Sequence, residues 1–180
     1  GFFLQDEWRM TPSFTLVAGA RYDLDTFIHP TISPRIALLY SPADGHTFRI
    51  SGSVGYRPPT LFEKKVDQQL SSTFPGPSPD LKGGQDIRPE QIISYNIGYQ
   101  GWFLNHRLRL RADLFFNHIS DLISFRTVSA TVVTPVNNEG SADIYGGEAG
   151  VEFLATRWLT GFANYSYQEI GQSFAGRIQR

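Results

Sequence analysis

Apolar and polar residues alternate along most of this chain with a period of two. Between residues 14 and 24 the even positions are apolar, whereas the odd positions include Thr15, Arg21 and Asp23. The same alternation recurs at residues 48–57, 107–117, 145–153 and 159–168. A period of two places successive side chains on opposite faces of an extended strand, so each segment is predicted to form a strand with one apolar face.

The pattern predicts about eight strands, and many of them are ten residues or longer. The predicted ranges are 2–10, 13–24, 33–41, 46–57, 91–103, 106–118, 143–155 and 158–170. Strands in soluble proteins are usually about five or six residues long, whereas a strand tilted across a bilayer needs about 9–11 residues. The lengths therefore favour strands that span a membrane.

The connections between the predicted strands alternate between short and long. The short ones are residues 11–12, 42–45, 104–105 and 156–157, and the longer ones are 25–32, 57–90 and 119–142. Outer-membrane barrels have short periplasmic turns and longer extracellular loops. A loop as long as residues 58–89, rich in Pro, Gly and Ser, is unusual in a soluble domain but expected on the outside of such a barrel.

The three tryptophans lie beside short turns. Trp8 and Trp102 precede two of these turns, and Trp158 follows a third. Aromatic rings favour the headgroup level of a membrane, so this placement is typical of the aromatic girdles of a barrel. Ordinary hydrophobic packing near hairpin turns is the alternative.

Arginines at alternate positions indicate what the polar face meets. Arg107, Arg109 and Arg111 share one face by the period of two, and burying them in a dry interior would cost several kcal/mol each unless they were paired. A lumen filled by water or by a plug removes that cost. Glu148 and Glu152 fall on the inward face of the next predicted strand, where they could pair with the arginines. The alternative to a binding role is that these charged residues only form salt bridges with one another or are solvated.

Composition excludes several functional classes. The chain has 180 residues, 41% apolar and 18% charged, with a net charge of −1 and no cysteine. The charge balance gives no reason to expect nucleic-acid binding, and without cysteine there is no thiol catalysis, disulfide or Cys-ligated zinc. The four histidines are scattered without metal-ligand spacing. We therefore expect no enzyme, no cofactor and no metal site.

Six segments together resemble a known family. They are Gly1–Trp8, Ala18–Asp23, Ser33–Pro42, Gly55–Glu63, Arg88–Gln91 with Tyr95–Tyr99, and Asn137–Glu148. In order and spacing they resemble the barrel domain of TonB-dependent outer-membrane receptors, and the strand-to-loop motif Gly55–Glu63 is the most specific of them. Each motif alone is modest, but the set covers nearly the whole chain.

The resemblance implies an all-β fold of antiparallel transmembrane strands, about eight from a barrel of about 22 strands. Residues 1–180 would form part of the receptor's barrel domain in the bacterial outer membrane, with the plug domain absent from the chain. The expected function is energised uptake of a scarce ligand such as a ferric siderophore, haem or cobalamin. The expected partners are outer-membrane lipid, the receptor's own plug, the TonB energy-transducing complex and a small-molecule ligand, with a metal chelate favoured.

On this resemblance the candidate ligand contacts in the long loops are Arg57, Phe74 and Lys82. The candidate lumen and plug contacts are Arg107, Arg109, Arg111, Glu148 and Glu152.

Two other functions stay open from the sequence. One is a small self-contained outer-membrane barrel with a structural or adhesin role, and the other is a soluble β-sandwich binding module. The sandwich predicts that Phe14, Leu16, Ile50, Leu110 and Phe153 meet inside a sealed interior, with the arginines turned to bulk solvent.

Overall fold

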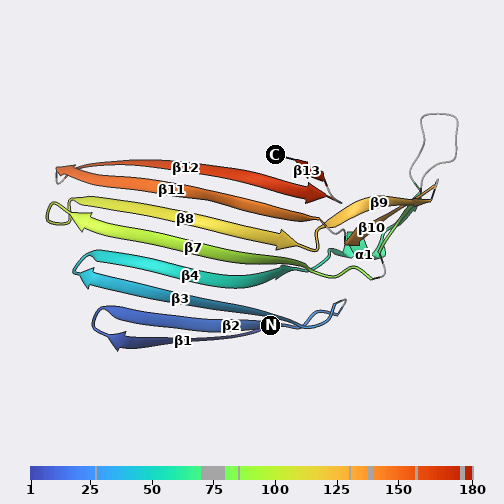
Figure 1. Ribbon diagram of the computed structural model, residues 1–180, viewed down its shortest axis with the longest axis horizontal. Coiled ribbons are helices and arrows are strands. Elements are labelled where there is room, and N and C mark those ends of the chain that lie inside the picture. The colour runs from blue at the N-terminus through green and yellow to red at the C-terminus, as the bar shows by residue number, and fades with distance from the viewer. Residues whose placement is uncertain are drawn as a thin grey trace.

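Most of the chain forms one large antiparallel sheet. The computed structural model describes residues 1–26, 28–69, 80–84, 86–129, 131–137, 140–156, 158–174 and 177–179. Within these ranges the sheet has nine strands in the order β1-β2-β3-β4-β7-β8-β11-β12-β13 (Figure 1). Its strands are β1 (Phe2–Thr11), β2 (Phe14–Asp23), β3 (Thr31–Ala43), β4 (His46–Arg57), β7 (Glu90–Phe103), β8 (Leu108–Ser120), β11 (Ser141–Thr156), β12 (Leu159–Phe174) and β13 (Arg177–Gln179). The eight long strands among them confirm the prediction from the alternating pattern.

The register of the sheet separates an apolar face from a polar face. Leu16, Leu38, Ile50, Ile97 and Leu114 lie opposite one another across five neighbouring strands. Directly opposed residues project to the same side of a sheet, so these side chains form one continuous apolar row. We call this side the outer face.

The adjacent row of the ladder is polar. It runs through Arg49, Gly98, Asp113, Glu148 and Ser166, again with each residue opposite the next. Its side chains project away from the outer face because successive residues of a strand alternate. We call this side the inner face.

The large sheet has no sealed hydrophobic core. Among the described residues the buried apolar side chains are those of Ala37, Ile87, Pro135 and Ala142, whereas Ile50 is 54% and Leu114 63% exposed. A β-sandwich would bury these side chains between two sheets, so that alternative is wrong. The sheet is a single layer whose outer face requires a surrounding apolar medium.

The described strands do not close into a barrel. β1 forms one edge of the sheet and β13 the other, and no pairing joins them. Open edges leave backbone groups unpaired, which is unfavourable in lipid. The open sheet is the arrangement expected of a segment of a larger barrel, and it does not favour a small self-contained one.

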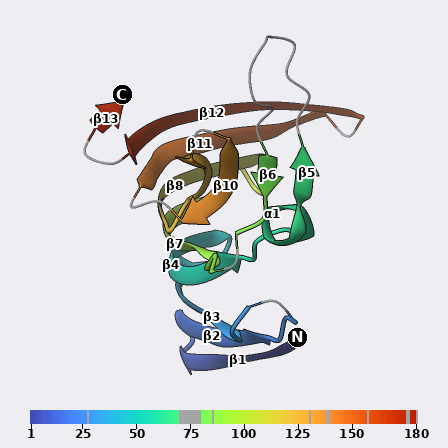
Figure 2. The same cartoon turned by 90° about the vertical axis from the view of Figure 1, so that its right-hand side faces the viewer.

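A second, smaller sheet lies at the end of the large sheet that carries the long loops, as the end-on view shows (Figure 2). Its order is β5-β6-β10-β9, with β6 and β10 parallel. The strands are β5 (Asp67–Gln69), β6 (Asp80–Lys82), β9 (Ile123–Ser129) and β10 (Val132–Asn137), accompanied by the short helix α1 (Leu61–Lys65). We call these four strands and α1 the loop sheet. The sequence analysis located the loops that contain it but not these elements.

The aromatic girdle differs in part from the prediction. On the outer face Phe14, Tyr40, Phe48 and Tyr99 form a row near the short turns, with ring centroids 4.5 to 6.3 Å apart. Trp102 instead lies on the inner face, because it is opposite Arg109 in the ladder. No helix in the described part of the chain is long and apolar enough to cross a membrane.

Candidate functional site

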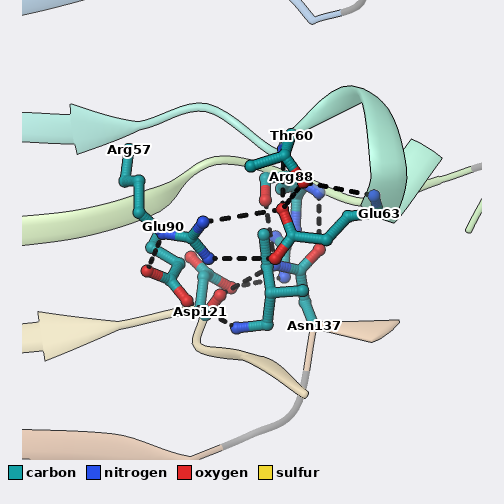
Figure 3. Close-up of polar contacts among 8 residues, drawn as sticks. Arg57, Thr60, Glu63, Arg88, Glu90, Asp121 and Asn137 are labelled. Carbon is teal, nitrogen blue, oxygen red and sulfur yellow. Dashed lines mark hydrogen bonds and ion pairs between the residues drawn. The ribbon is translucent and has the colours of Figure 1, made fainter. Parts of the chain in front are cut away.

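A polar cluster joins the loop sheet to the ends of the long strands. It contains Arg57, Thr60, Glu63, Arg88, Glu90, Asp121 and Asn137, which converge from four separate segments (Figure 3). Arg57 ends β4, Glu90 begins β7, Asp121 follows β8 and Asn137 ends β10. We call this set the strand-end cluster.

Arg57 is held between two carboxylates. Its Nε donates to Glu90 Oε2 at 2.6 Å, and its Nη2 lies 3.4 Å from Glu63 Oε1. The other carboxylate oxygen of Glu90 accepts from the backbone N–H of Ile123 at 2.8 Å. Glu90 therefore connects the end of β4, the start of β7 and the start of β9.

Glu63 also completes a capping box on α1. The Thr60 hydroxyl accepts from the Glu63 N–H at 3.2 Å, and the Thr60 N–H donates to Glu63 Oε2 at 2.6 Å. These reciprocal bonds satisfy backbone donors that the first turn of a helix leaves free. Burial raises the pKa of the Glu63 carboxyl, but the hydrogen bonds from Thr60 and Arg57 outweigh it and hold the pKa below its usual value.

The other half of the cluster is organised by Asn137. Its Oδ1 accepts from the Arg88 N–H at 2.5 Å, and its Nδ2 donates to the carbonyl oxygens of Arg88 and Asp121 at 2.9 and 2.7 Å. The Arg88 guanidinium also pairs with Asp121 at 2.7 Å. One amide therefore fixes the end of β10 against the segments that precede β7 and follow β8.

A cavity of about 530 Å³ lies next to the strand-end cluster. Its walls come from the β2–β3 loop, α1 and the segment before β7. They combine apolar and ionisable side chains of both signs, and they include Ile28, His29, Lys64, Asp86 and Arg88. A mixture of this kind suits a small polar group.

Ion pairs and hollows follow the inner face of the large sheet. Arg49 pairs with Asp113 at 3.1 Å, and Arg109 pairs with Glu152. Two hollows of about 390 and 400 Å³ share Arg111 and Asp113 in their walls. Charged groups at these positions fit a water-filled or plug-filled lumen, because a dry core would leave Arg111 at a high desolvation cost.

The structure places the predicted site residues in three different regions. Arg57 lies in the strand-end cluster and Lys82 in β6 of the loop sheet, whereas Phe74 is outside the described residues. The remaining five predicted residues lie on or near the long strands: Arg109, Arg111, Glu148 and Glu152 are on the inner face, and Arg107 is not.

Arg107 differs from the expected position. It lies in the turn before β8, where its guanidinium donates to the carbonyl oxygens of Leu154 and Ala155 and sits 5.8 Å from the Phe153 ring. Phe153 projects from the outer face, since Leu108 is its partner in the ladder. The positive φ angles of Leu104, Asn105 and His106 turn the chain, so the strand alternation does not extend to Arg107.

Sequence reasoning missed most of the strand-end cluster. Glu63, Arg88, Glu90, Asp121 and Asn137 were not singled out as site residues. One signal was present, because Thr60 followed three positions later by Glu63 is the sequence signature of a capping box. In the described residues no group of three or more His, Asp or Glu side chains is arranged to hold a metal ion.

Comparison with curated proteins finds an outer-membrane relative from Vibrio cholerae. The chain is 26% identical over 190 aligned residues to the iron-regulated outer membrane virulence protein of Vibrio cholerae serotype O1, covering 97% of this chain and 28% of that protein. The chain thus spans under a third of the length of this curated relative.

Solved structures resemble the fold. The siderophore receptor PirA from Acinetobacter baumannii gives a TM-score of 0.75 at 18% identity, covering 92% of this chain and 27% of that one. A mutant of the ferric enterobactin receptor PfeA from Pseudomonas aeruginosa, in complex with enterobactin, gives 0.77 at 19% identity, covering 92% and 26%. In both cases the nine-stranded sheet corresponds to part of a larger chain.

The family match covers nearly the whole chain. Residues 1–178 match the family described as TonB dependent receptor-like, beta-barrel. These barrels lie in the bacterial outer membrane, which accounts for the exposed apolar outer face and for long strands without a sealed core. By its sequence match, its strand pattern and its open sheet, the chain belongs to the family of TonB-dependent receptor β-barrels.

Proposed function

We propose that the complete receptor containing this chain binds an iron chelate outside the cell and imports it in a TonB-dependent step. The observation that carries the proposal is the loop sheet. The strand-end cluster holds it against the ends of the long strands, beside the polar inner face. A barrel that served only as a structural element would not need a folded platform of this kind.

The known proteins support iron as the cargo. The Vibrio cholerae relative is named for its regulation by iron, and the two solved structures described above are named as a siderophore receptor and a ferric enterobactin receptor. One of them contains enterobactin. A ferric siderophore is accordingly the favoured ligand, and the proposed role is transport, not catalysis.

The long loops would supply the ligand contacts. Phe74 and Lys82 are retained as candidate contacts, and the cavity lined by His29, Lys64 and Arg88 adds a second candidate region. Arg57 would act as a positioning residue, because Glu63 and Glu90 already occupy its guanidinium. Its function would be to hold α1 and the loop sheet over the lumen.

The inner face would contact the plug. Arg109, Arg111, Glu148 and Glu152 are the proposed lumen residues, and Arg107 is removed from this set because it binds carbonyl oxygens at the opposite end of the sheet. The plug domain and the TonB complex are proposed partners of the complete receptor.

Uptake of radiolabelled iron tests the proposal. Cells that carry the complete receptor as their single iron-chelate receptor would be given ferric enterobactin, haem or cobalamin in separate experiments. We expect uptake of ferric enterobactin that requires TonB, and loss of this uptake when residues 58–89 are replaced by a short Gly-Ser linker. Unchanged uptake in the shortened receptor, with normal amounts of folded protein in the outer membrane, would overturn the role of the loop sheet.

Cobalamin and haem serve as the contrasting ligands. Uptake of either one in place of ferric enterobactin would refute the siderophore assignment while leaving energised transport intact. Uptake of none of the three, with a receptor that does not support growth under iron limitation, would refute import of an iron chelate.

A further inference from the structure

The outer face is not uniformly bulky. In β2, β3, β4 and β7 one row consists of the stacked rings of Phe14, Tyr40, Phe48 and Tyr99. The same row continues through Ala112 of β8 and Ala149 of β11 before it reaches Tyr165 of β12. Two methyl groups therefore stand where the neighbouring strands present aromatic rings.

The small side chains leave an apolar groove. Two hollows of about 450 and 620 Å³ lie on either side of Ala149, and both are lined by Ala112, Ala149 and Tyr165. Leu110 and Val151 line the first, and Leu114 lines the second. Because the hollows share their central residues, they form one groove along β8, β11 and β12, which we call the outer groove.

The outer groove points toward the short-turn end of the sheet. Val151 lines it, and Phe153, two residues further along the same face of β11, lies beneath the Arg107 guanidinium at 5.8 Å. Trp158, 83% exposed in the adjacent turn, marks the headgroup level on this side. The cation therefore sits at the depth of lipid phosphates, directly beyond the end of the groove.

The charge of Arg107 is not neutralised within the described part of the chain. Its Nε and Nη2 donate to backbone carbonyl oxygens of β11, and none of the ion pairs found there includes it. Carbonyl contacts orient a guanidinium without cancelling its charge. An Arg held in this way is well suited to a phosphate, which its planar fork can bind through two parallel hydrogen bonds.

We propose that the outer groove binds a phospholipid of the periplasmic leaflet, with one acyl chain in the groove and its phosphate on Arg107. Lipid is the occupant because the outer face of a transmembrane barrel already meets the acyl chains of the membrane. A phospholipid fits better than an outer-leaflet lipid, since the outer leaflet lies at the opposite end, beside the loop sheet. The site is independent of the ligand that the receptor transports.

Photo-crosslinking of the complete receptor in detergent tests the site. The probe is a phosphatidylethanolamine with a diazirine on one acyl chain, added at about one molecule per receptor. We expect crosslinks in peptides of β8, β11 and β12. Equal labelling of β2, β3 and β4 would overturn the proposal, because their outer faces carry no such groove.

Two substitutions separate the acyl-chain site from the phosphate site. Ala149→Phe fills the middle of the groove, and we expect at least about tenfold less crosslinking, since a few displaced methylene groups suffice. Arg107→Gln removes the cation while keeping a polar side chain, and we expect roughly tenfold weaker labelling. A diazirine-labelled alkyl maltoside, which has no phosphate, should be insensitive to Arg107→Gln.

A second groove variant and a control keep the result interpretable if Ala149→Phe fails to fold. Gly161→Leu extends into open space opposite Phe153, where an added Cβ meets nothing within 4 Å, and should also reduce phospholipid labelling. Ala20→Phe is the control. Ala20 lies on the outer face of β2, far from the outer groove, so its enlargement should leave labelling unchanged. Labelling that is unaffected by Gly161→Leu and Arg107→Gln, or that lipid A displaces regardless of Arg107, would refute the site.

Discussion

The large sheet and the loop sheet are held together by different forces. The large sheet is stabilised by long ladders between its eight strands of ten to sixteen residues, and it exposes side chains such as Ile97 and Leu114 on its outer face. The loop sheet has strands of three to seven residues. It depends on polar contacts of a few residues, above all Glu90 and Asn137. The large sheet should therefore be sensitive to its match with lipid, and the loop sheet to single polar substitutions.

A charge on the outer face should have the largest effect. Leu114→Arg introduces a cation in the middle of β8, where lipid-facing arginine destabilises a barrel by about 2–4 kcal/mol. We expect a lower urea midpoint for the complete receptor refolded in phospholipid vesicles, measured by tryptophan fluorescence.

Gln168→Arg is the matched control for this substitution. Gln168 lies on the inner face of β12, next to the row that contains Leu114. Because its side chain points to the lumen, the same charge should change the midpoint little. Equal losses for the two variants would show that the outer face does not meet lipid.

Loss of the Glu90 charge should have the next largest effect, confined to the loop sheet. Glu90→Gln leaves Arg57 with Glu63 alone and weakens the bond to the Ile123 N–H. Hydrogen bonds to charged groups contribute about 1.5–3 kcal/mol, and we expect about 1–2 because Arg57 is half-exposed. Amide hydrogen exchange should become faster in β9, β10 and α1 while the long strands remain protected.

Arg21→Gln provides the comparison. Arg21 pairs with Asp23 at 2.8 Å within a single strand, so this ion pair connects no separate segments. Its loss should leave exchange in the loop sheet unchanged. If Glu90→Gln accelerated exchange no more than Arg21→Gln, the strand-end cluster would not be what holds the loop sheet.

The difference between the large sheet and the loop sheet also decides how much of the fold could be predicted from the sequence. The long strands can be recognised from local sequence alone, because lipid on one side and water on the other require apolar and polar residues to alternate over segments such as 14–24. The loop strands β5 and β6 are three residues long, too short for any period to emerge. Their pairing depends on segments brought together by the rest of the fold, including the parallel contact between β6 and β10.

The residues of the candidate site also differ in whether local sequence reveals them. Arg57 was identified because it lies in a recognisable motif at the end of a strand. Its partner Glu90 is 33 residues away, and the contacts of Asn137 with Arg88 span 49 residues, so no local spacing reveals them. The misplacement of Arg107 has the opposite cause. The sequence alternates without a break through residue 107, but a turn of three consecutive positive φ angles interrupts the strand just before it.

Removal of the helix cap should have a smaller effect than loss of Glu90. Thr60→Ala deletes the hydroxyl that accepts from the Glu63 N–H, and such caps contribute about 1 kcal/mol. Hydrogen exchange should become faster in α1 while β9 and β10 change little. Thr60→Ser retains the hydroxyl and should restore protection, and equal behaviour of Ala and Ser at this position would show that the cap is not formed.

Acidification should give the smallest and most selective effect. The folded pKa of Glu63 is lowered, so the stability that its ionised carboxylate contributes is complete above its ordinary pKa of about 4.5 and is lost as pH falls through the folded value. The difference in α1 exchange between the native receptor and Glu63→Gln should therefore be present at pH 7 and vanish in acid. Glu7→Gln, on β1 far from the loops, should show no such difference at either pH. A Glu63→Gln difference that persisted unchanged well below pH 4 would mean that the shape of the side chain, not its charge, connects α1 to the strand ends.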